Sequence, residues 1–203
     1  EQLTRSLRTR AGLKFVEEVL NSDQKFNQSM VQNLLFNHRH YGAEVFLDDI
    51  LTVCEQSEDL LEACEILGQW DRRQNLDSVG AVIFNRFWSI ARTVRDHYSV
   101  PFDVNNPIHT PSGLKIEETA TQDFITASLQ EAVASLSEAG IPLNAKWGDV
   151  QFVLRNEEKI GIPGGSGRQG MFSVITSRFD TDKGGYNPIT HGNSYIQVVT
   201  WND

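Results

Sequence analysis

Cysteine is nearly absent from this chain, since Cys54 and Cys64 are the only two among 203 residues. Two thiols are too few for a disulfide framework or for a thiolate zinc site. No run of roughly 18 consecutive apolar residues occurs, which argues against a membrane-spanning helix. The first residue is Glu1 rather than Met, and no leader of charged, apolar and small residues follows it. We therefore expect a processed chain or a piece of one.

Positive charge is also scarce. The chain has 18 Lys and Arg but 27 Asp and Glu, which gives a formal net charge of −9. An acidic surface repels phosphate backbones and anionic lipids. We therefore expect neither nucleic acid nor a membrane as a partner. The length and a hydrophobic fraction of 39% suffice for one large domain or two small ones with a buried core.

Helical spacing dominates residues 1–98, where apolar side chains recur three or four positions apart. This spacing is seen at Leu13, Val16, Val19, Leu20, Val31, Leu34, Leu35, Phe46, Ile50, Val53, Val79, Ile83, Phe87, Ile90 and Val94. Ser57 and Ser78 are predicted to cap the starts of two helices, and Gly68 to follow the end of one.

Residues 99–118 are rich in proline and lack periodicity, which predicts a long loop. A further helix is predicted over 119–140, with Thr121 as its N-cap and with Gly140 at its end. Its apolar stripe consists of Ile125, Leu129, Ala132 and Leu136.

Residues 141–203 are predicted to form strands, because β-branched and aromatic residues cluster at 150–154, 171–176 and 194–201. Helices followed by strands, without alternation, predict the α+β class. The last predicted strand has no hairpin partner after it. We therefore expect polypeptide outside these residues to complete the sheet.

Residues 165–170 form a formal G-x-G-x-x-G motif. A dinucleotide site needs a strand before this motif and a helix after it, but a strand-like segment follows here. Protein-kinase and Walker A signatures are missing as well. The motif therefore predicts a glycine-rich turn.

No constellation in the sequence is sufficient for catalysis. His38 and His40 are spaced as H-x-H, but no H-E-x-x-H accompanies them, and structural or surface roles are expected for all five histidines. Ser194 follows His191 closely, yet no G-x-S-x-G elbow is present and turn residues explain the pair more simply. We expect no metal site from these residues.

Three stretches of the chain resemble the penicillin acylase family. Residues 63–88 follow the family pattern C-x-x-L-x-x-W-D and then D-S-x-G-A before an aromatic helix. Residues 162–170 match its glycine-rich turn. Residues 191–199 are close to the H-G-x-S-Y-I-Q-V-V strand of the acyl-homoserine-lactone acylase branch. The resemblance covers nearly the whole chain and places it in the C-proximal part of the β-subunit.

The resemblance implies an N-terminal-nucleophile amidohydrolase with a four-layer αββα core, matured by self-cleavage of a bacterial precursor in the periplasm or outside the cell. Its serine nucleophile would use its own α-amine as base and would lie outside this chain, which begins with Glu1. The implied partners are the α-subunit, the remaining β-subunit segments and a small acyl amide. No catalytic cofactor is implied. The family allows a structural calcium ion, for which no ligand is identified in this chain.

One functional position is implied by the resemblance: an arginine just before a helix that braces the oxyanion asparagine of the family. Arg10 is the first candidate for this supporting catalytic role and Arg8 is the alternative. A surface arginine near a helix start is the plainer explanation. The implied activity is removal of the acyl chain from N-acyl-homoserine lactones (quorum quenching). A β-lactam acylase, with a role in antibiotic resistance, and a non-catalytic helical interaction module remain as alternatives.

Overall fold

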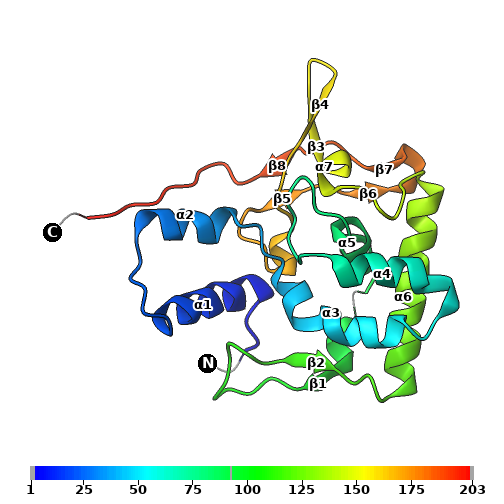
Figure 1. Cartoon of the computed structure of the whole chain (residues 1–203), viewed down its shortest axis with the longest axis horizontal. Helices are drawn as coiled ribbons and strands as arrows, with labels where there is room; N and C mark the ends of the chain where they lie inside the picture. Colours follow the sequence, from blue (N-terminus) through cyan, green and yellow to red (C-terminus); the bar gives the residue numbers. More distant parts are fainter. Residues whose placement is uncertain (1–2, 92, 202–203) are drawn as a thin grey trace.

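The computed structural model describes residues 3–91 and 93–201. Glu1, on which the expectation about the nucleophile rests, and Asp203 lie outside the described residues. Helices come first and short antiparallel strand pairs follow, so the predicted α+β class is confirmed (Figure 1). No helix in the described ranges combines the length and apolar character that crossing a bilayer requires.

Helices build the first half of the chain. They are α1 (Leu7–Leu20), α2 (Gln28–Phe36), α3 (Tyr41–Cys54), α4 (Leu61–Gln69) and α5 (Ala81–Ile90), with short 3₁₀ turns η1 (Glu58–Leu60) and η2 (Val94–His97). The apolar faces of α3, α4 and α5 are buried together. By contrast, α2 contains no buried residue. The α1–α2 pair projects to one side of the main body (Figure 1).

The helix boundaries correct two of the expected ends. Ser57 precedes η1 without a side-chain capping bond, so the regular helix α4 starts later than expected. Gly68 lies within α4, and the chain leaves the helix at Trp70, whose backbone is extended. A glycine ends a helix only when its backbone turns left-handed, and Gly68 has no such conformation.

Ser78 does not cap α5 either. Its hydroxyl donates to Asp71 and accepts from the backbone N–H of Asn75, which stabilises the loop before the helix. Gly80 takes the cap position with φ of 97°. An added Cβ there would lie 2.6 Å from Cβ of Trp70, so the tight α4–α5 corner requires glycine.

Helix α6 (Thr119–Glu138) packs across α3 and α5. Its predicted apolar stripe is buried completely, with no exposed area on Ile125, Leu129, Ala132 or Leu136. The N-cap is Glu118 rather than Thr121. Thr121 is buried within the first turn, where its hydroxyl bonds to Nδ1 of His97 at 3.0 Å. The predicted stop is found, since Gly140 has φ of 68° just after the helix.

The two cysteines form a disulfide bridge between the end of α3 and the middle of α4. The Cα atoms of Cys54 and Cys64 are 5.9 Å apart, and both side chains are buried. The chain therefore lacks a disulfide framework but has one bridge, which the sequence analysis did not predict. It closes a loop that links two helices of the core.

The strands pair two by two and antiparallel. The pairs are β1 (Tyr98–Val100) with β2 (Ser112–Leu114), β3 (Phe152–Arg155) with β4 (Glu158–Gly161), β5 (Ile175–Thr176) with β8 (His191–Gly192), and β6 (Phe179–Asp180) with β7 (Gly185–Tyr186). A short helix α7 (Trp147–Val150) and two 3₁₀ turns, η3 (Gly167–Gln169) and η4 (Thr181–Lys183), complete the described elements.

Several strand predictions are wrong in extent. The proline-rich segment 99–118 contains the β1–β2 hairpin rather than loop alone. The segment 150–154 starts as the end of α7, and only the last two residues of 171–176 pair as a strand. Residues 194–201 form no strand and leave Tyr195 and Trp201 exposed. β-Propensity reflects packing against neighbours, and this segment has no partner strand among the described residues.

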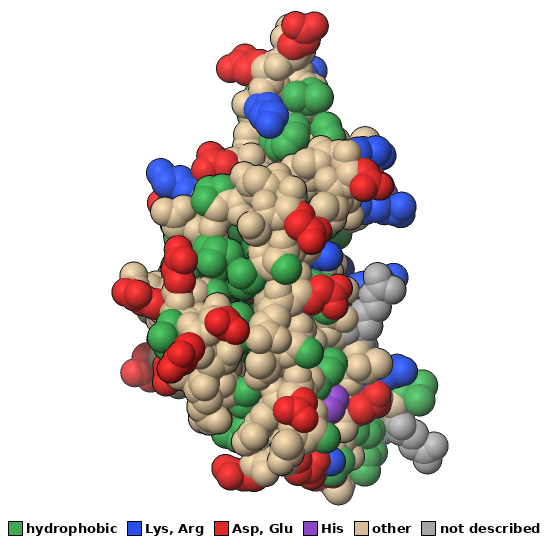
Figure 2. Space-filling view, turned by 90° about the vertical axis from the view of Figure 1, so that its right-hand side faces the viewer, with side chains coloured by type: hydrophobic (Ala, Val, Ile, Leu, Met, Phe, Trp, Pro, Cys, Tyr) green, Lys and Arg blue, Asp and Glu red, His purple; other side chains and the backbone are tan. Residues whose placement is uncertain are grey.

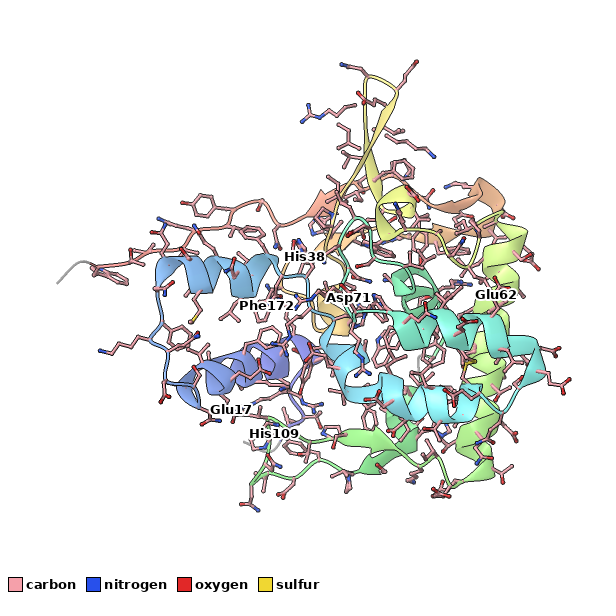
Figure 3. All side chains as sticks on the ribbon, in the orientation of Figure 1. Glu17, His38, Glu62, Asp71, His109 and Phe172 are labelled. Carbon is pink, nitrogen blue, oxygen red and sulfur yellow. A yellow bond between two sulfur atoms is a disulfide. The ribbon has the colours of Figure 1, made fainter. Side chains whose placement is uncertain are left out.

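The β1–β2 hairpin is attached to α1 by contacts from its connecting loop. Nε2 of His109 lies 3.1 Å from Oε2 of Glu17, and both side chains are labelled in Figure 3. Figure 2, which views the molecule from the right-hand side of Figure 1, shows Asp and Glu side chains spread over that face. The hairpin and α1 together form one wall of the cavity described next.

Candidate functional site

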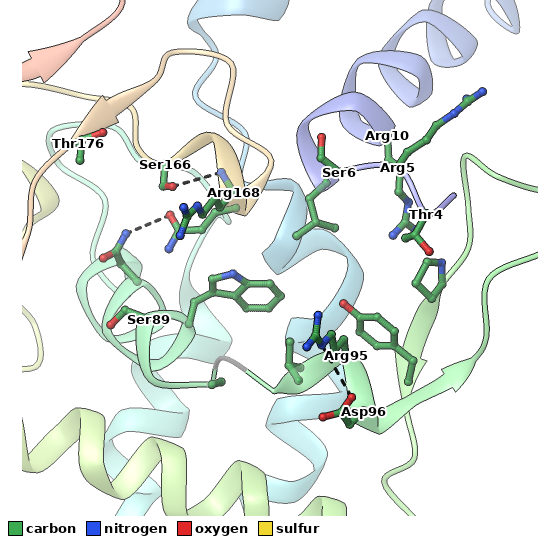
Figure 4. Close-up of a pocket in the computed structure, with 18 of the residues that line it drawn as sticks. Thr4, Arg5, Ser6, Arg10, Ser89, Arg95, Asp96, Ser166, Arg168 and Thr176 are labelled. Atoms are coloured by element: carbon green, nitrogen blue, oxygen red, sulfur yellow. Dashed lines mark hydrogen bonds and ion pairs between the residues drawn. The ribbon is translucent and has the colours of Figure 1, made fainter. Parts of the chain in front are cut away.

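A cavity of about 1270 Å³ opens between the start of α1, the end of α5, the β1–β2 hairpin and the glycine-rich turn. Figure 4 shows Ser6 and Arg10 on the α1 side, with Ser166, Arg168 and Thr176 on the side of the glycine-rich turn. Its lining residues include Arg10, Asn85, Trp88, Trp147, Gln151 and Gln169. Segments that are far apart in sequence therefore meet at one cavity.

Arg10 lies in the first turns of α1, which Ser6 caps by accepting a hydrogen bond from the backbone N–H of Thr9. Arg10 is 2% exposed. Its Nε donates to the carbonyl of Ile108 at 2.7 Å, and its guanidinium carbon lies 5.6 Å from the ring centroid of Tyr41. These contacts offset the unfavourable placement of a cation near a helix N-terminus. The explanation as a surface arginine is therefore wrong for Arg10.

The environment of Arg10 also affects the pKa of Tyr41. Burial raises the pKa of its phenol, and the positive charge of Arg10 opposes that rise. The phenol therefore remains protonated at neutral pH beside the guanidinium.

Arg8, the alternative, has a different environment. Its Nε donates to the carbonyl of Met171 at 3.2 Å and its Nη2 to the carbonyl of Phe172 at 3.4 Å. Its guanidinium carbon also lies 5.4 Å from the ring centroid of Phe172. Arg8 is exposed and attaches α1 to the segment after η3, outside the lining of the cavity. The structure thus separates a cavity arginine from an anchoring arginine.

The cavity is positively charged within an acidic protein. Among the described residues that line it, Arg5, Arg10, Arg95 and Arg168 are basic and Asp96 alone is acidic. Oδ1 of Asp96 lies 3.9 Å from Nε of Arg95, and both side chains are exposed. A cavity lined in this way attracts groups that carry negative charge or accept hydrogen bonds.

The glycine-rich turn is structural, as predicted. Gly170 has φ of 88°, and an added Cβ would lie 2.6 Å from Cβ of Tyr41. Gly164 accepts two hydrogen bonds from Nε2 of Gln151 and Nε1 of Trp147, at 2.8 and 2.9 Å. The turn is thereby fixed against the cavity floor, and no helix follows it as a dinucleotide site would require.

In the part of the chain that the structure describes, no three His, Cys, Asp or Glu side chains gather in a way that could hold a metal ion. His40 is buried and caps α3, because its Nδ1 accepts from the backbone N–H of Ala43. His191 pairs with Thr176 in a strand pair, while Ser194 lies beyond it in an irregular segment.

Sequence reasoning missed a polar network at the cavity wall, in which Asn85 and Gln169 line the cavity and Tyr186 lies behind them. Asn85 donates from Nδ2 to Oε1 of Gln169 at 3.2 Å, and the hydroxyl of Tyr186 donates to Oδ1 of Asn85 at 3.0 Å. The only sequence signal for Gln169 was its place in the glycine-rich turn. No sequence pattern pointed to Asn85 or Tyr186.

A second, apolar groove of about 790 Å³ adjoins the cavity, and Ser6 borders both. Its walls are the facing sides of α1 and α2, with Phe172 and the segment near Val198. The side chains that line it are mainly aliphatic and aromatic. A polar, cationic cavity and an apolar groove therefore lie side by side.

Comparison with known proteins agrees with these features. A sequence model of the penicillin amidase family matches residues 2–203. The acyl-homoserine lactone acylase PvdQ of Pseudomonas syringae pv. syringae (strain B728a) is 32% identical over 192 residues, which cover 92% of this chain and 24% of that protein. The PvdQ acylase of Pseudomonas savastanoi pv. phaseolicola (strain 1448A / Race 6) is 33% identical over 94% of the chain and 25% of its own length.

Aculeacin-A acylase of Actinoplanes utahensis is 30% identical over 214 residues, which cover 98% of this chain and 26% of that protein. The chain thus spans about a quarter of the length of the curated relatives it matches. The family match extends over almost every residue, including Arg10 and the glycine-rich turn. The chain belongs to the penicillin amidase family.

Proposed function

We propose that this chain is a C-proximal part of the β-subunit of an amidohydrolase that removes the acyl chain from N-acyl-homoserine lactones. The nucleophile would be an N-terminal serine on another chain, and the assembled enzyme would have the four-layer αββα fold. The observation that carries the proposal is the burial of Arg10 in a cationic cavity within a chain of this family. The names of the relatives supply the reaction class.

Arg10 would support the chemistry without performing it. A guanidinium is always charged and presents several donors in a plane, so it can position an asparagine carbonyl and a substrate carbonyl in one geometry. The Ile108 carbonyl occupies Nε and thereby orients the rest of the group. An oxyanion formed when the serine attacks the amide would be stabilised by donors fixed in this way.

The apolar groove beside the cavity supports an acyl amide as substrate. A ligand of this kind has a polar head and an alkyl chain. The polar cavity suits the head and the apolar groove suits the chain, and the two hollows meet at Ser6. Burial of each methylene in such a groove contributes about 0.8 kcal/mol.

The proposed partners are the α-subunit and the remaining segments of the β-subunit. The proposed location is the periplasm or the exterior of a bacterial cell, which the Cys54–Cys64 bridge supports because disulfides persist in oxidising compartments. No catalytic cofactor is proposed. The structural calcium that the family allows receives no support from the described side chains.

The deciding experiment expresses the complete precursor, purifies the chains that remain together, and measures release of decanoate from N-decanoyl-homoserine lactone. The expected result is co-purification of this chain with one that begins in serine, and turnover that the chain alone does not show. Equal activity in the isolated chain would contradict the assignment of the nucleophile. Faster release of the side chain of penicillin G would favour the β-lactam acylase. Neither activity would favour the interaction module, against which the family match argues.

A further inference from the structure

Arg10 is held between a buried and an exposed part of the molecule. On one side its guanidinium carbon lies 5.6 Å from the ring centroid of Tyr41, which belongs to the core helix α3. On the other side its Nε donates to the carbonyl of Ile108 at 2.7 Å. Ile108 lies in the connection between β1 and β2 (residues 101–111, the hairpin loop), of which residues 103–106 are exposed. The hairpin loop is therefore the side of Arg10 that needs further contacts to stay in place.

The hairpin loop is folded on itself, so its tip should move as one unit. Thr110 is 4% exposed, accepts from the backbone N–H of Asp103 at 2.9 Å and donates to the carbonyl of Asn106 at 2.7 Å. The carbonyl of Ile108 belongs to the same planar peptide unit as the backbone nitrogen of His109. A contact made by His109 therefore also restrains the carbonyl that holds Arg10.

His109 makes such a contact with α1. Its Nε2 lies 3.1 Å from Oε2 of Glu17, and the two side chains lie next to one another in Figure 3. Glu17 is two turns of helix after Arg10, so both residues lie on the same face of α1. The contact does not require a charged ring, because Nε2 can donate from neutral histidine as well as from the cation. Adjacent residues of the hairpin loop are thus held by one helix face at two levels.

The base of the hairpin is fixed independently of α1. Oδ2 of Asp49 on α3 accepts from the backbone N–H of Leu114 at 2.7 Å, and β1 pairs with β2. Loss of the contact between Glu17 and His109 should therefore leave the hairpin attached to the core and loosen its loop. The carbonyl partner of Arg10 would then move with that loop.

We infer that Glu17 and His109 are positioning residues for Arg10. They hold the hairpin loop against α1, so that the Ile108 carbonyl fixes the guanidinium at the cavity. Neither Glu17 nor His109 is among the described residues that line the cavity, so both act through Arg10 and not on the substrate. The inference rests on the proposed function for the part that Arg10 plays in the reaction, and it adds two residues that lie outside the cavity.

Exchange of the Arg10 Nε–H with water measures this positioning without requiring turnover. The 203-residue chain is labelled with nitrogen-15 at arginine and studied by NMR at pH 6, and Arg10→Lys identifies the resonance. Exchange should be about three- to fivefold faster in Glu17→Ala and in His109→Leu, because loss of a partly exposed ion pair makes opening of the loop more frequent. Alanine preserves the helix at position 17, and leucine keeps the approximate volume of the imidazole.

Two further variants serve as controls for this measurement. His109→Gln should recover wild-type exchange to within about twofold, because the glutamine Nε2 is also an N–H donor. Lys14→Met removes an ion pair with Glu18 on the same helix and should leave the exchange of Arg10 unchanged. Unchanged exchange in both Glu17→Ala and His109→Leu overturns the inference.

Kinetics of the assembled enzyme provide the second measurement. Glu17→Ala and His109→Leu should lower kcat for N-decanoyl-homoserine lactone by about threefold and leave KM unchanged, because a guanidinium that braces the oxyanion acts in the transition state. A contact that only stabilises the fold would lower the melting temperature without this split. Unchanged kcat in variants whose Arg10 exchange is faster also overturns the inference. Faster exchange in a protein that hydrolyses no acyl amide would support the positioning of Arg10 and contradict the proposed function alone.

Discussion

Arg39 and Glu44 form a two-point ion pair, with Nε 2.6 Å from Oε1 and Nη2 2.8 Å from Oε2. The same guanidinium reaches Glu18 on α1 through Nη1 at 2.6 Å and lies 4.1 Å from the ring centroid of Phe15. Because Glu44 belongs to α3, this single side chain joins α1 to the core. That junction adds to the hydrogen bonds of Arg8 and Arg10 in holding α1, which forms one wall of the cavity.

Replacing Arg39 by lysine should lower the free energy of unfolding by about 1 kcal/mol. Lysine retains the charge but cannot bond two carboxylates in parallel. The measurement is urea unfolding followed by circular dichroism. Lys14→Met, which removes a more exposed partner of Glu18, should cost less than about 0.5 kcal/mol. Equal losses in both variants would contradict the special role of the guanidinium.

The stabilisation from the Arg39–Glu18 ion pair should also depend on pH. Arg39 lowers the pKa of Glu18 to about 2, so its stabilisation is present above the ordinary value of 4.5 and is lost as the pH falls toward 2. The carboxylate is 39% exposed, and salt should therefore weaken the effect. Unfolding curves at pH 4.5 and pH 3, with and without 1 M NaCl, would measure it. An Arg39→Lys chain should show a smaller difference between the two pH values.

His40 should make the fold sensitive to mild acid. Burial against the rings of Trp70 and Phe84 lowers the pKa of His40 to about 3, whereas the unfolded chain takes up a proton near 6.5. Its neutral form therefore contributes full stability above pH 6.5, and this stability is lost as the pH falls toward 3. Between pH 7 and pH 5 the loss is about 2 kcal/mol.

His40→Asn isolates that effect, because asparagine can cap a helix but does not titrate. The difference in unfolding free energy between pH 7 and pH 5 should shrink by more than half, although His38, whose pKa burial also lowers, will leave a remainder. His191→Asn, at an exposed position, should keep the wild-type difference. An unchanged difference in His40→Asn would refute the assignment.

Arg10→Ala should affect catalysis more than stability in the assembled enzyme. If Arg10 braces the oxyanion site, its loss should reduce kcat/KM by about 10²–10³, and Arg10→Lys should recover little. Arg8→Ala should instead lower the melting temperature with a small change in turnover, because Arg8 bonds to the Met171 and Phe172 carbonyls and does not line the cavity. Near-normal turnover in Arg10→Ala would show that the residue is scaffold.

Loss of the Cys54–Cys64 bridge should lower the free energy of unfolding by about 2–3 kcal/mol, because the bridge closes a loop with a sequence separation of 10. The Cys54→Ala/Cys64→Ala double variant, compared with the oxidised chain by thermal unfolding, measures this loss. The wild-type chain in dithiothreitol serves as a second comparison. A reduced chain that melts like the oxidised one would show that the bridge contributes nothing to stability.

The sequence best predicts which residues are buried when a long helix carries a single periodic apolar stripe that packs against the core. The α6 stripe at Ile125, Leu129, Ala132 and Leu136 is fully buried, since spacing alone decides which side of a long helix packs inward. The ends of helices and strands are predicted less well. Gly68 sits inside α4 because glycine permits a helix end without requiring one, and residues 194–201 have strand propensity but no neighbour to pair with.

The candidate site could be predicted only in part for a related reason. Arg10 was found from a local resemblance, but its burial depends on Ile108, 98 residues later. Asn85, Gln169 and Tyr186 come together from three elements through side-chain hydrogen bonds that leave no local pattern. Such networks arise from tertiary packing, which spacing and propensity do not encode.

Helix α2 buries none of its residues, and this has a consequence for the apolar groove that it borders. Its Leu34 is only partly buried against the cluster of Ala11, Phe15 and Tyr41, so α2 should open at a smaller free energy than the core helices, and its amide hydrogens should exchange with deuterium before those of α3 or α6. We therefore expect one wall of the groove to open more readily than the rest of the fold. If so, the groove should widen for a longer chain by movement of α2 alone, and the range of chain lengths that it admits should depend on how readily this helix opens.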